Sequence, residues 1–214
     1  MKPIYLAALL AFGSVSCVDD VPQLQVLHAA LPEDDCSIPE DEAILRGSLD
    51  MTLASNYRLG LIVTSNRIGT EILVGEGGQV SSPGSQVVFI TSMDVSYQTE
   101  PDLGIEDTNV RLFGGFEGGE GSSMLLNVLT PQARDALDAA TLGGAIVDTL
   151  ITIKFKGHTA ANNKVEANEF TFPLTVGRSG YGCPAGQQFA APTANCDLRG
   201  HNGIVPECED IPVP

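Results

Sequence analysis

The feature that most constrains the fold is a series of short segments in which apolar and polar residues alternate with a period of two. The first such segment spans residues 43–53 and the second residues 57–65. Alternation of this kind is typical of strands with one buried face. The residues expected to face the core are Leu45, Gly47, Leu49, Met51, Leu53, Tyr57, Leu59, Leu61 and Val63. The three residues between the two segments predict an antiparallel hairpin.

Further strand-like segments follow, each bounded by Gly, Pro, Asn or Asp: residues 70–74, 86–97, 109–113, 122–129, 145–157 and 164–176. In the last two, the expected inward residues are Val147, Ile151, Ile153, Phe155, Phe170, Phe172, Leu174 and Val176. Residues 158–163 predict a hairpin loop, and Pro173 favours an edge strand because proline lacks an N–H. The spacing predicts a mainly β domain over residues 43–177, an antiparallel immunoglobulin-like β-sandwich.

One short helix interrupts the strands. Thr130 is a suitable N-cap and Pro131 fits the first helical position. Ala133, Leu137 and Ala140 form one apolar stripe, and Gly143 with Gly144 ends the helix. We expect this helix to cross one end of the sandwich.

The first sixteen residues have the pattern of a secretory signal peptide: one cation, Lys2, an apolar stretch over residues 4–12, and small residues over 13–16. Two export routes compete at the same bond. Ser14 and Ser16 suit an ordinary signal peptidase, whereas Val15-Ser16-Cys17 resembles the bacterial lipobox, with Ser14 where that motif has Leu, Val or Ile.

Cysteine arithmetic favours lipidation of Cys17. The chain has five cysteines, and an exported protein meets an oxidising compartment in which thiols pair. Four can pair and one is left over, which a lipid anchor at Cys17 explains without an exposed thiol. Val18 rather than Asp follows Cys17, which favours the outer membrane. We therefore expect a cell-envelope protein held to the membrane by this anchor.

Residues 17–42 are acidic and proline-containing, and we interpret them as a spacer in which residues 24–31 could form a brief helix. The tail over 178–214 is rich in Gly, Pro and Cys and needs covalent staples to be ordered. Three disulfide pairings are compatible with the four remaining cysteines. We favour Cys36 with Cys183 and Cys196 with Cys208, because the first would tie both ends of the sandwich together.

The formal net charge of −16 disfavours nucleic acid and anionic lipid headgroups as partner surfaces. Common hydrolase, P-loop and zinc-protease motifs do not occur in the sequence, so we predict no cofactor and no catalytic residue. His158 is expected in a solvated loop. His201 could join Cys183, Cys196 and Cys208 in a zinc site, but their irregular spacing favours disulfides.

Acidic clusters leave two alternatives open. Calcium could bind between the loops at 100–107 and 117–120, which contain Glu100, Asp102, Glu106, Asp107, Glu117 and Glu120. A hydrolase could instead use two such carboxylates where they converge in a cleft. The remaining carboxylates are expected to be solvated.

The order of "GSLDMTL", "YRLGLIVTSN", a strand ending in "MDVSY", "ITIKFKGHTAANNKVEANEFTFPLTV" and a cysteine-bearing tail resembles a group of uncharacterised exported lipoproteins of myxobacteria and related bacteria. The resemblance covers about residues 43–208. It implies a β-sandwich envelope protein and carries over no catalytic residue. We accordingly expect a non-enzymatic binding or structural module that has an envelope protein as its partner.

Overall fold

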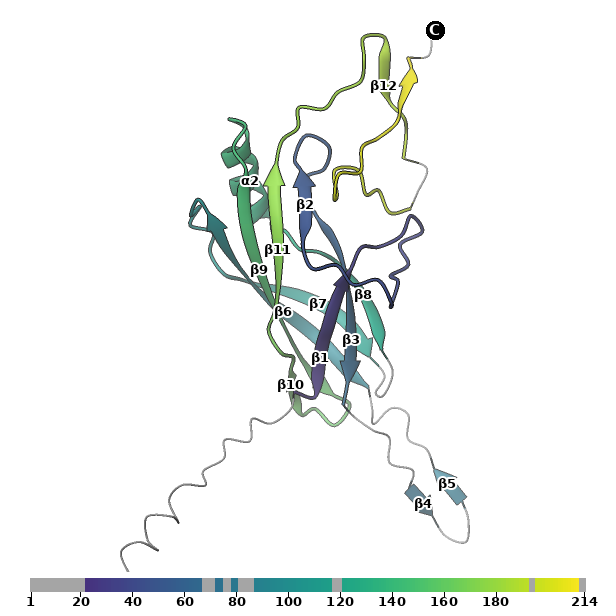
Figure 1. Ribbon diagram of the computed structural model, residues 1–214. Coiled ribbons are helices and arrows are strands. Elements are labelled where there is room, and N and C mark those ends of the chain that lie inside the picture. Colours follow the sequence, from purple (N-terminus) through teal and green to yellow (C-terminus); the bar gives the residue numbers. More distant parts are fainter. Residues whose placement is uncertain are drawn as a thin grey trace, which may run out of the picture.

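The computed structural model describes residues 22–66, 72–74, 78–80, 87–116, 121–192 and 195–211. This part of the chain is mainly β, with antiparallel and mixed sheets, one short helix and two disulfides (Figure 1). No helix within it is long and apolar enough to cross a bilayer.

Two sheets form the body of the molecule. The larger contains β2 (Gly47–Asp50), β11 (Phe170–Gly177), β9 (Val147–Thr159), β6 (Val88–Glu100) and β7 (Thr108–Phe116) in that order, with β10 (Lys164–Glu166) also paired to β9. The smaller contains β1 (Leu24–Ala30), β3 (Arg58–Ser65) and β8 (Ser122–Asn127). Neighbouring strands are antiparallel, except that β2 and β11 are parallel. The short pairs β4 (Ile72–Val74) with β5 (Gly78–Val80) and β12 (Gln187–Phe189) with β13 (Cys208–Asp210) lie outside these sheets.

The apolar sides of both sheets belong to one continuous core. Alternation in β9 and β11 buries Val147, Ile151, Ile153, Phe155, Phe172, Leu174 and Val176, as the period-two pattern predicts, whereas Phe170 is partly buried. From the smaller sheet, Leu59, Leu61 and Val63 are fully buried in the same cluster. The large apolar residues of alternating strands therefore join the two sheets.

The helix α2 (Pro131–Thr141) confirms the sequence prediction in detail. The Thr130 side chain accepts a hydrogen bond from the Ala133 N–H, and Pro131 occupies the first turn. Ala133 and Leu137 are buried, and Gly144 has a φ of +81° just beyond the helix end. The helix packs against β9 and β11 near one end of the larger sheet (Figure 1).

The predicted hairpin between residues 43–53 and 57–65 is wrong. β2 pairs with β11 and β3 pairs with β1 and β8, so the intervening residues carry the chain from one sheet to the other. The N–H groups of Leu53 and Ala54 both donate to the Asp50 carbonyl, which forms a helical turn rather than a two-strand loop. Leu45, expected to face the core, is 86 % exposed because it precedes β2.

The predicted spacer is also corrected. Residues 24–30 form β1, neither a linker nor a helix, and Leu24, Val26 and Ala29 are buried in the core. The register of β1 against β3 shifts between Val26 and His28. This irregularity breaks the period of two, which explains why the alternation is not visible in the sequence.

The predicted hairpin from β9 through residues 158–163 is confirmed, with β10 and β11 both antiparallel to β9. The loop itself is shorter, because β9 continues to Thr159 and includes His158. The prediction that Pro173 lies on an edge strand is wrong, since β11 lies between β2 and β9. However, β2 pairs only with Leu174 to Gly177. The residue without an N–H therefore stands just outside that contact.

Candidate functional site beneath the C-terminal tail

The two disulfides connect the four cysteines that the sequence left to pair, but not in the favoured combination. Cys36 is bonded to Cys196 and Cys183 to Cys208, so the expected pairs Cys36–Cys183 and Cys196–Cys208 are wrong. The loop after β1 lies beside the tail, where the Cys196 N–H donates to the Asp34 carbonyl at 2.9 Å. The first bond therefore joins the tail to the smaller sheet. Cys17, the predicted lipidation site, lies outside the described residues.

The tail also covers the edge of the larger sheet. The Asp50 N–H donates to the Gly200 carbonyl and the Asn202 N–H to the Ser48 carbonyl, both at 2.8 Å. The Asn202 side chain accepts the Ser48 N–H in return. Gly200 has a φ of +81°, and a Cβ there would lie 2.9 Å from the Asp50 carbonyl oxygen, so glycine is needed for this approach. The tail thus extends the sheet beyond β2.

His201 connects the tail to both sheets, because its backbone pairs with Leu49 of β2 and its side chain contacts Arg58 of β3. It is only 2 % exposed, and its Nε2 accepts the backbone N–H of Arg58 at 2.9 Å. Its Nδ1 lies 3.2 Å from the Arg199 carbonyl and donates to it. The ring is therefore neutral, with its proton on Nδ1. Burial lowers the pKa of His201, which favours the same neutral form.

Tyr57 lies beneath the imidazole, with the two ring centroids 4.9 Å apart. Its hydroxyl donates to the Asn202 side-chain oxygen at 3.2 Å, and burial raises the pKa of Tyr57 to about 12. Gly47 leaves room for this ring, because a Cβ there would lie 2.4 Å from the Tyr57 hydroxyl oxygen. The histidine that was a candidate zinc ligand is thus a packing and hydrogen-bonding residue, and its three cysteine neighbours in sequence form disulfides.

Two adjacent hollows lie next to this junction, and Arg58 lines both. One has a volume of about 300 Å³ and is lined mainly by polar residues, including Asn56, Asp197 and His201. The other, of about 260 Å³, is lined by Cys36, Arg58, Leu125, Leu126, Asn127, Asn195 and Cys196. We call the two together the Arg58 hollow. Arg58 and Asn127 are direct neighbours on β3 and β8.

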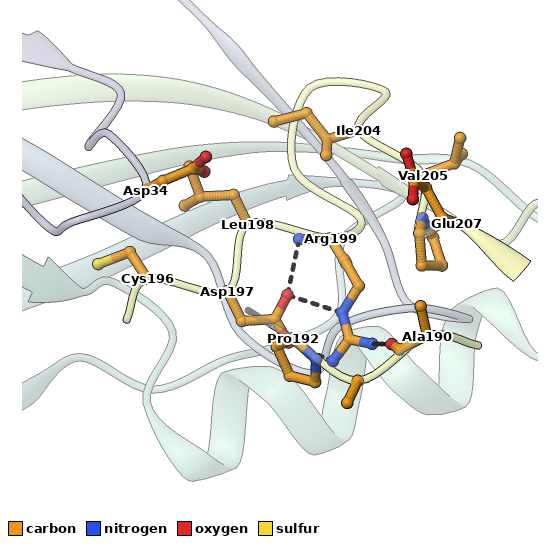
Figure 2. Close-up of a pocket in the computed structure, with 12 residues that line it drawn as sticks. Asp34, Ala190, Pro192, Cys196, Asp197, Leu198, Arg199, Ile204, Val205 and Glu207 are labelled. Atoms are coloured by element: carbon orange, nitrogen blue, oxygen red, sulfur yellow. Dashed lines mark hydrogen bonds and ion pairs between the residues drawn. The ribbon is translucent and has the colours of Figure 1, made fainter. Parts of the chain in front are cut away.

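A third hollow, of about 320 Å³, is lined by the tail and by Asp34 of the loop after β1, and it is shown in Figure 2. Its charged residues include Arg199, whose guanidinium faces the Asp197 carboxylate and also donates to the Ala190 carbonyl. The hydrogen bond from Arg199 lowers the pKa of Asp197. Two further carboxylates, those of Asp34 and Glu207, also line this hollow, so its lining is acidic apart from Arg199.

On the larger sheet, a hollow of about 510 Å³ brings two carboxylates together. Glu100 on β6 is directly opposite Asp148 on β9, and both line this hollow. The Asp148 carboxylate accepts a hydrogen bond from the Thr175 hydroxyl at 2.7 Å. Of the acidic residues suggested for calcium, Glu100, Asp102, Glu106 and Asp107 are exposed, and 117–120 lie outside the described residues. No group of three or more potential metal ligands occurs in the described segments.

The sequence did not single out Arg58 or Asp148. The signal for Arg58 was an outward-facing cation on a strongly alternating strand of an acidic chain, and several of the residues that line the hollow with it come from the tail, 137 or more residues away in sequence. The other two histidines are not near this junction: His28 lies in β1 and His158 contacts Phe89. The chain matches no protein-family model, and no curated protein is detectably similar to it.

Proposed function

We propose that the protein is an exported envelope lipoprotein, anchored through Cys17, that acts as a non-enzymatic binding module. One observation carries the proposal: four of the five cysteines form two disulfides, which leaves Cys17 for lipidation. Disulfides of this kind persist in oxidising compartments, which supports export after removal of residues 1–16. Outer-membrane placement and membership of the myxobacterial lipoprotein group are part of the same proposal.

The placement of the Arg58 hollow supports a binding role. Leu24, the first residue of β1, is paired with Ser65, whereas Arg58 lies seven residues earlier on β3. At the rise of a β-strand this separates the two ends by roughly 20 Å. Leu24 is close in sequence to Cys17, so an anchor there would leave the hollow and the tail on the far side from the membrane (Figure 1).

We also propose that the two sheets form the immunoglobulin-like sandwich expected from the sequence. Their shared core and the predominance of antiparallel pairs support this arrangement. Two features of the larger sheet should be compared with sandwiches of that type. They are the parallel pairing of β2 with β11 and the order of the strands.

The anchor is tested by mass spectrometry of the mature N-terminus together with membrane fractionation. The proposal expects a peptide that begins at Cys17 with the mass of a lipid modification. A Cys17→Ser variant should no longer fractionate with membranes. An unmodified mature N-terminus at Cys17 would contradict the anchored function.

The binding role is tested separately, by crosslinking in intact cells. Full-length protein should recover a reproducible envelope partner, and the Cys17→Ser variant provides the control for contacts that only reflect membrane attachment. Failure to recover any partner from cells in which the protein is abundant would oppose a protein-binding role.

A hydrolase is the second candidate, and one observation favours it. Glu100 and Asp148 are cross-strand neighbours in a hollow, and such neighbours have Cβ atoms about 5 Å apart. Retaining glycosidases also use a pair of carboxyl groups, held about 5 Å apart, a separation that side chains at neighbouring strand positions allow. Hydrolysis of chromogenic glycosides by the purified protein, abolished in Glu100→Gln and in Asp148→Asn, would support this function. No hydrolysis would remove it.

A further inference from the structure

Arg58 differs from the other partly buried arginines of the structure in its partners. Arg134, Arg178 and Arg199 each form an ion pair with an aspartate. The guanidinium of Arg58 makes no hydrogen bond or ion pair with any described residue, and its Nη1 atom is buried without a partner. An unpaired buried donor on a charged group is energetically unfavourable, and in a native structure it calls for an explanation such as a bound water or ion.

On one side of the Arg58 guanidinium, the described residues that line the hollow supply hydrogen-bond donors but no anion that could pair with it. The described residues that line the smaller part of the Arg58 hollow include the carboxamides of Asn127 and Asn195 and no carboxylate. Among the described residues that line the larger part, the one carboxylate is that of Asp197, which is already paired with Arg199. Arg58 thus forms no ion pair with a described residue, although its charge acts on the Asp197 carboxylate, whose pKa is lowered mainly by Arg199 and in smaller part by Arg58.

The same walls also offer an apolar surface. Leu125, which is 37 % exposed, and Leu126 line the smaller part together with the disulfide between Cys36 and Cys196. A volume of about 260 Å³ accommodates a ligand of a few carbon atoms beside its charged group. The flat guanidinium fork matches the two oxygens of a carboxylate better than a spherical anion.

We infer that the Arg58 hollow binds the carboxylate of a small apolar acid, either a free acid or the C-terminus of a peptide. Arg58 pairs with the carboxylate, Asn127 donates to it, and Leu125 and Leu126 contact the apolar part. This inference specifies the ligand of the proposed binding function. It requires neither export nor the anchor, so it can fail or succeed independently of both.

The test uses the mature chain purified with both disulfides formed, and measures binding by isothermal titration and by chemical shifts in NMR spectra. The probes are 4-methylpentanoate and N-acetyl-leucine, which represent the free acid and the peptide C-terminus. Their neutral controls are the corresponding amides, which preserve shape without charge. We expect saturable binding of at least one acid and binding of its amide weaker by about tenfold or more.

Substitutions then show whether the acid binds in the Arg58 hollow. Arg58→Gln should lose about tenfold or more in affinity, whereas Arg111→Gln, which removes the same charge from an exposed position on β7, should bind like the wild type. If Arg58→Gln does not fold, Arg58→Lys retains the charge without the fork and should still weaken binding.

Three results would overturn the inference. The first is that neither acid binds, and the second is that acid and amide bind equally. The third is that binding survives unchanged in a folded Arg58 variant. Binding of sulfate or phosphate without either acid would equally contradict a carboxylate site.

Discussion

The imidazole Nε2 of His201 accepts the backbone N–H of Arg58 at 2.9 Å, although 143 residues separate the two in the sequence. β1 pairs with β3 only as far as Gly60, so it does not reach the start of β3. His201 therefore supplies the acceptor that a neighbouring strand would otherwise provide. The contact makes the tail a structural part of the domain and holds it beside the Arg58 hollow.

Replacement of His201 by alanine should destabilise the domain by roughly 3 kcal/mol, since it leaves the Arg58 N–H unpaired and opens a cavity over Tyr57. His201→Phe preserves an aromatic ring over Tyr57 and isolates the loss of the acceptor. Urea unfolding gives the free energies. His28→Ala, at a partly exposed position in β1, is the control and should cost less than about 1 kcal/mol. An equal effect at both positions would contradict this role of His201.

The buried imidazole also predicts the pH dependence of stability. Burial lowers the pKa of His201 below its ordinary value of 6.5, so the unfolded chain binds a proton at higher pH than the folded one. The free energy of unfolding should therefore be constant above about pH 7 and fall as the pH decreases from 6.5 towards the lowered pKa.

The pH range in which His201 changes the free energy of unfolding is separate from the range in which the paired aspartates change it. The pKa of Asp197 is lowered from 3.8, so its contribution is present above that pH and is lost only as the pH falls further. Unfolding free energies measured between pH 5 and 8 should therefore report mainly on His201. The slope in this range should decrease in His201→Phe, and an unchanged slope would assign it to another group.

The extent to which sequence predicts this fold differs between elements for identifiable reasons. In β9 and β11, large apolar residues at every second position define both the strand and its buried face, and the N-cap Thr130 with Pro131 defines the helix start. The partner of a strand is not encoded locally. Residues 43–53 and 57–65 were both predicted as strands from their alternation, yet they enter different sheets.

The candidate site was less predictable because its residues meet only through long-range contacts. The order of the tail depends on two disulfides, a glycine at positive φ and the contacts of His201, none of which produces a period in the sequence. Arg58 has the pattern of a solvated outward residue until the tail covers it. The hollow that surrounds Arg58 exists only when the Cys36 loop and the tail are placed beside β3, so the sequence gives no sign of it.

We predict that the two disulfides stabilise the fold to different extents, because they close loops of different lengths. Cys36 and Cys196 are 160 residues apart and Cys183 and Cys208 are 25 apart. In the chain-entropy model, the longer loop stabilises by about 5 kcal/mol and the shorter by about 3.5 kcal/mol. The Cys36→Ser/Cys196→Ser variant should therefore unfold at lower urea concentration than Cys183→Ser/Cys208→Ser. Peptide mapping without reduction checks the pairing itself, and a peptide that joins Cys36 to Cys183 would contradict the structure.

At the carboxylates of Glu100 and Asp148 we predict a substitution that stabilises the fold, whereas the substitutions above destabilise it. Like charges directly opposite each other on neighbouring strands repel, at a cost of roughly 0.2–1 kcal/mol. Glu100→Gln removes the repulsion without changing the shape of the side chain, so its free energy of unfolding should rise within that range. Glu166→Gln is the matched control, because Glu166 pairs with Lys154 and its loss should not stabilise. The rise should shrink in high salt, which screens exposed charges, and persistence of the full effect there would show that repulsion is not its cause.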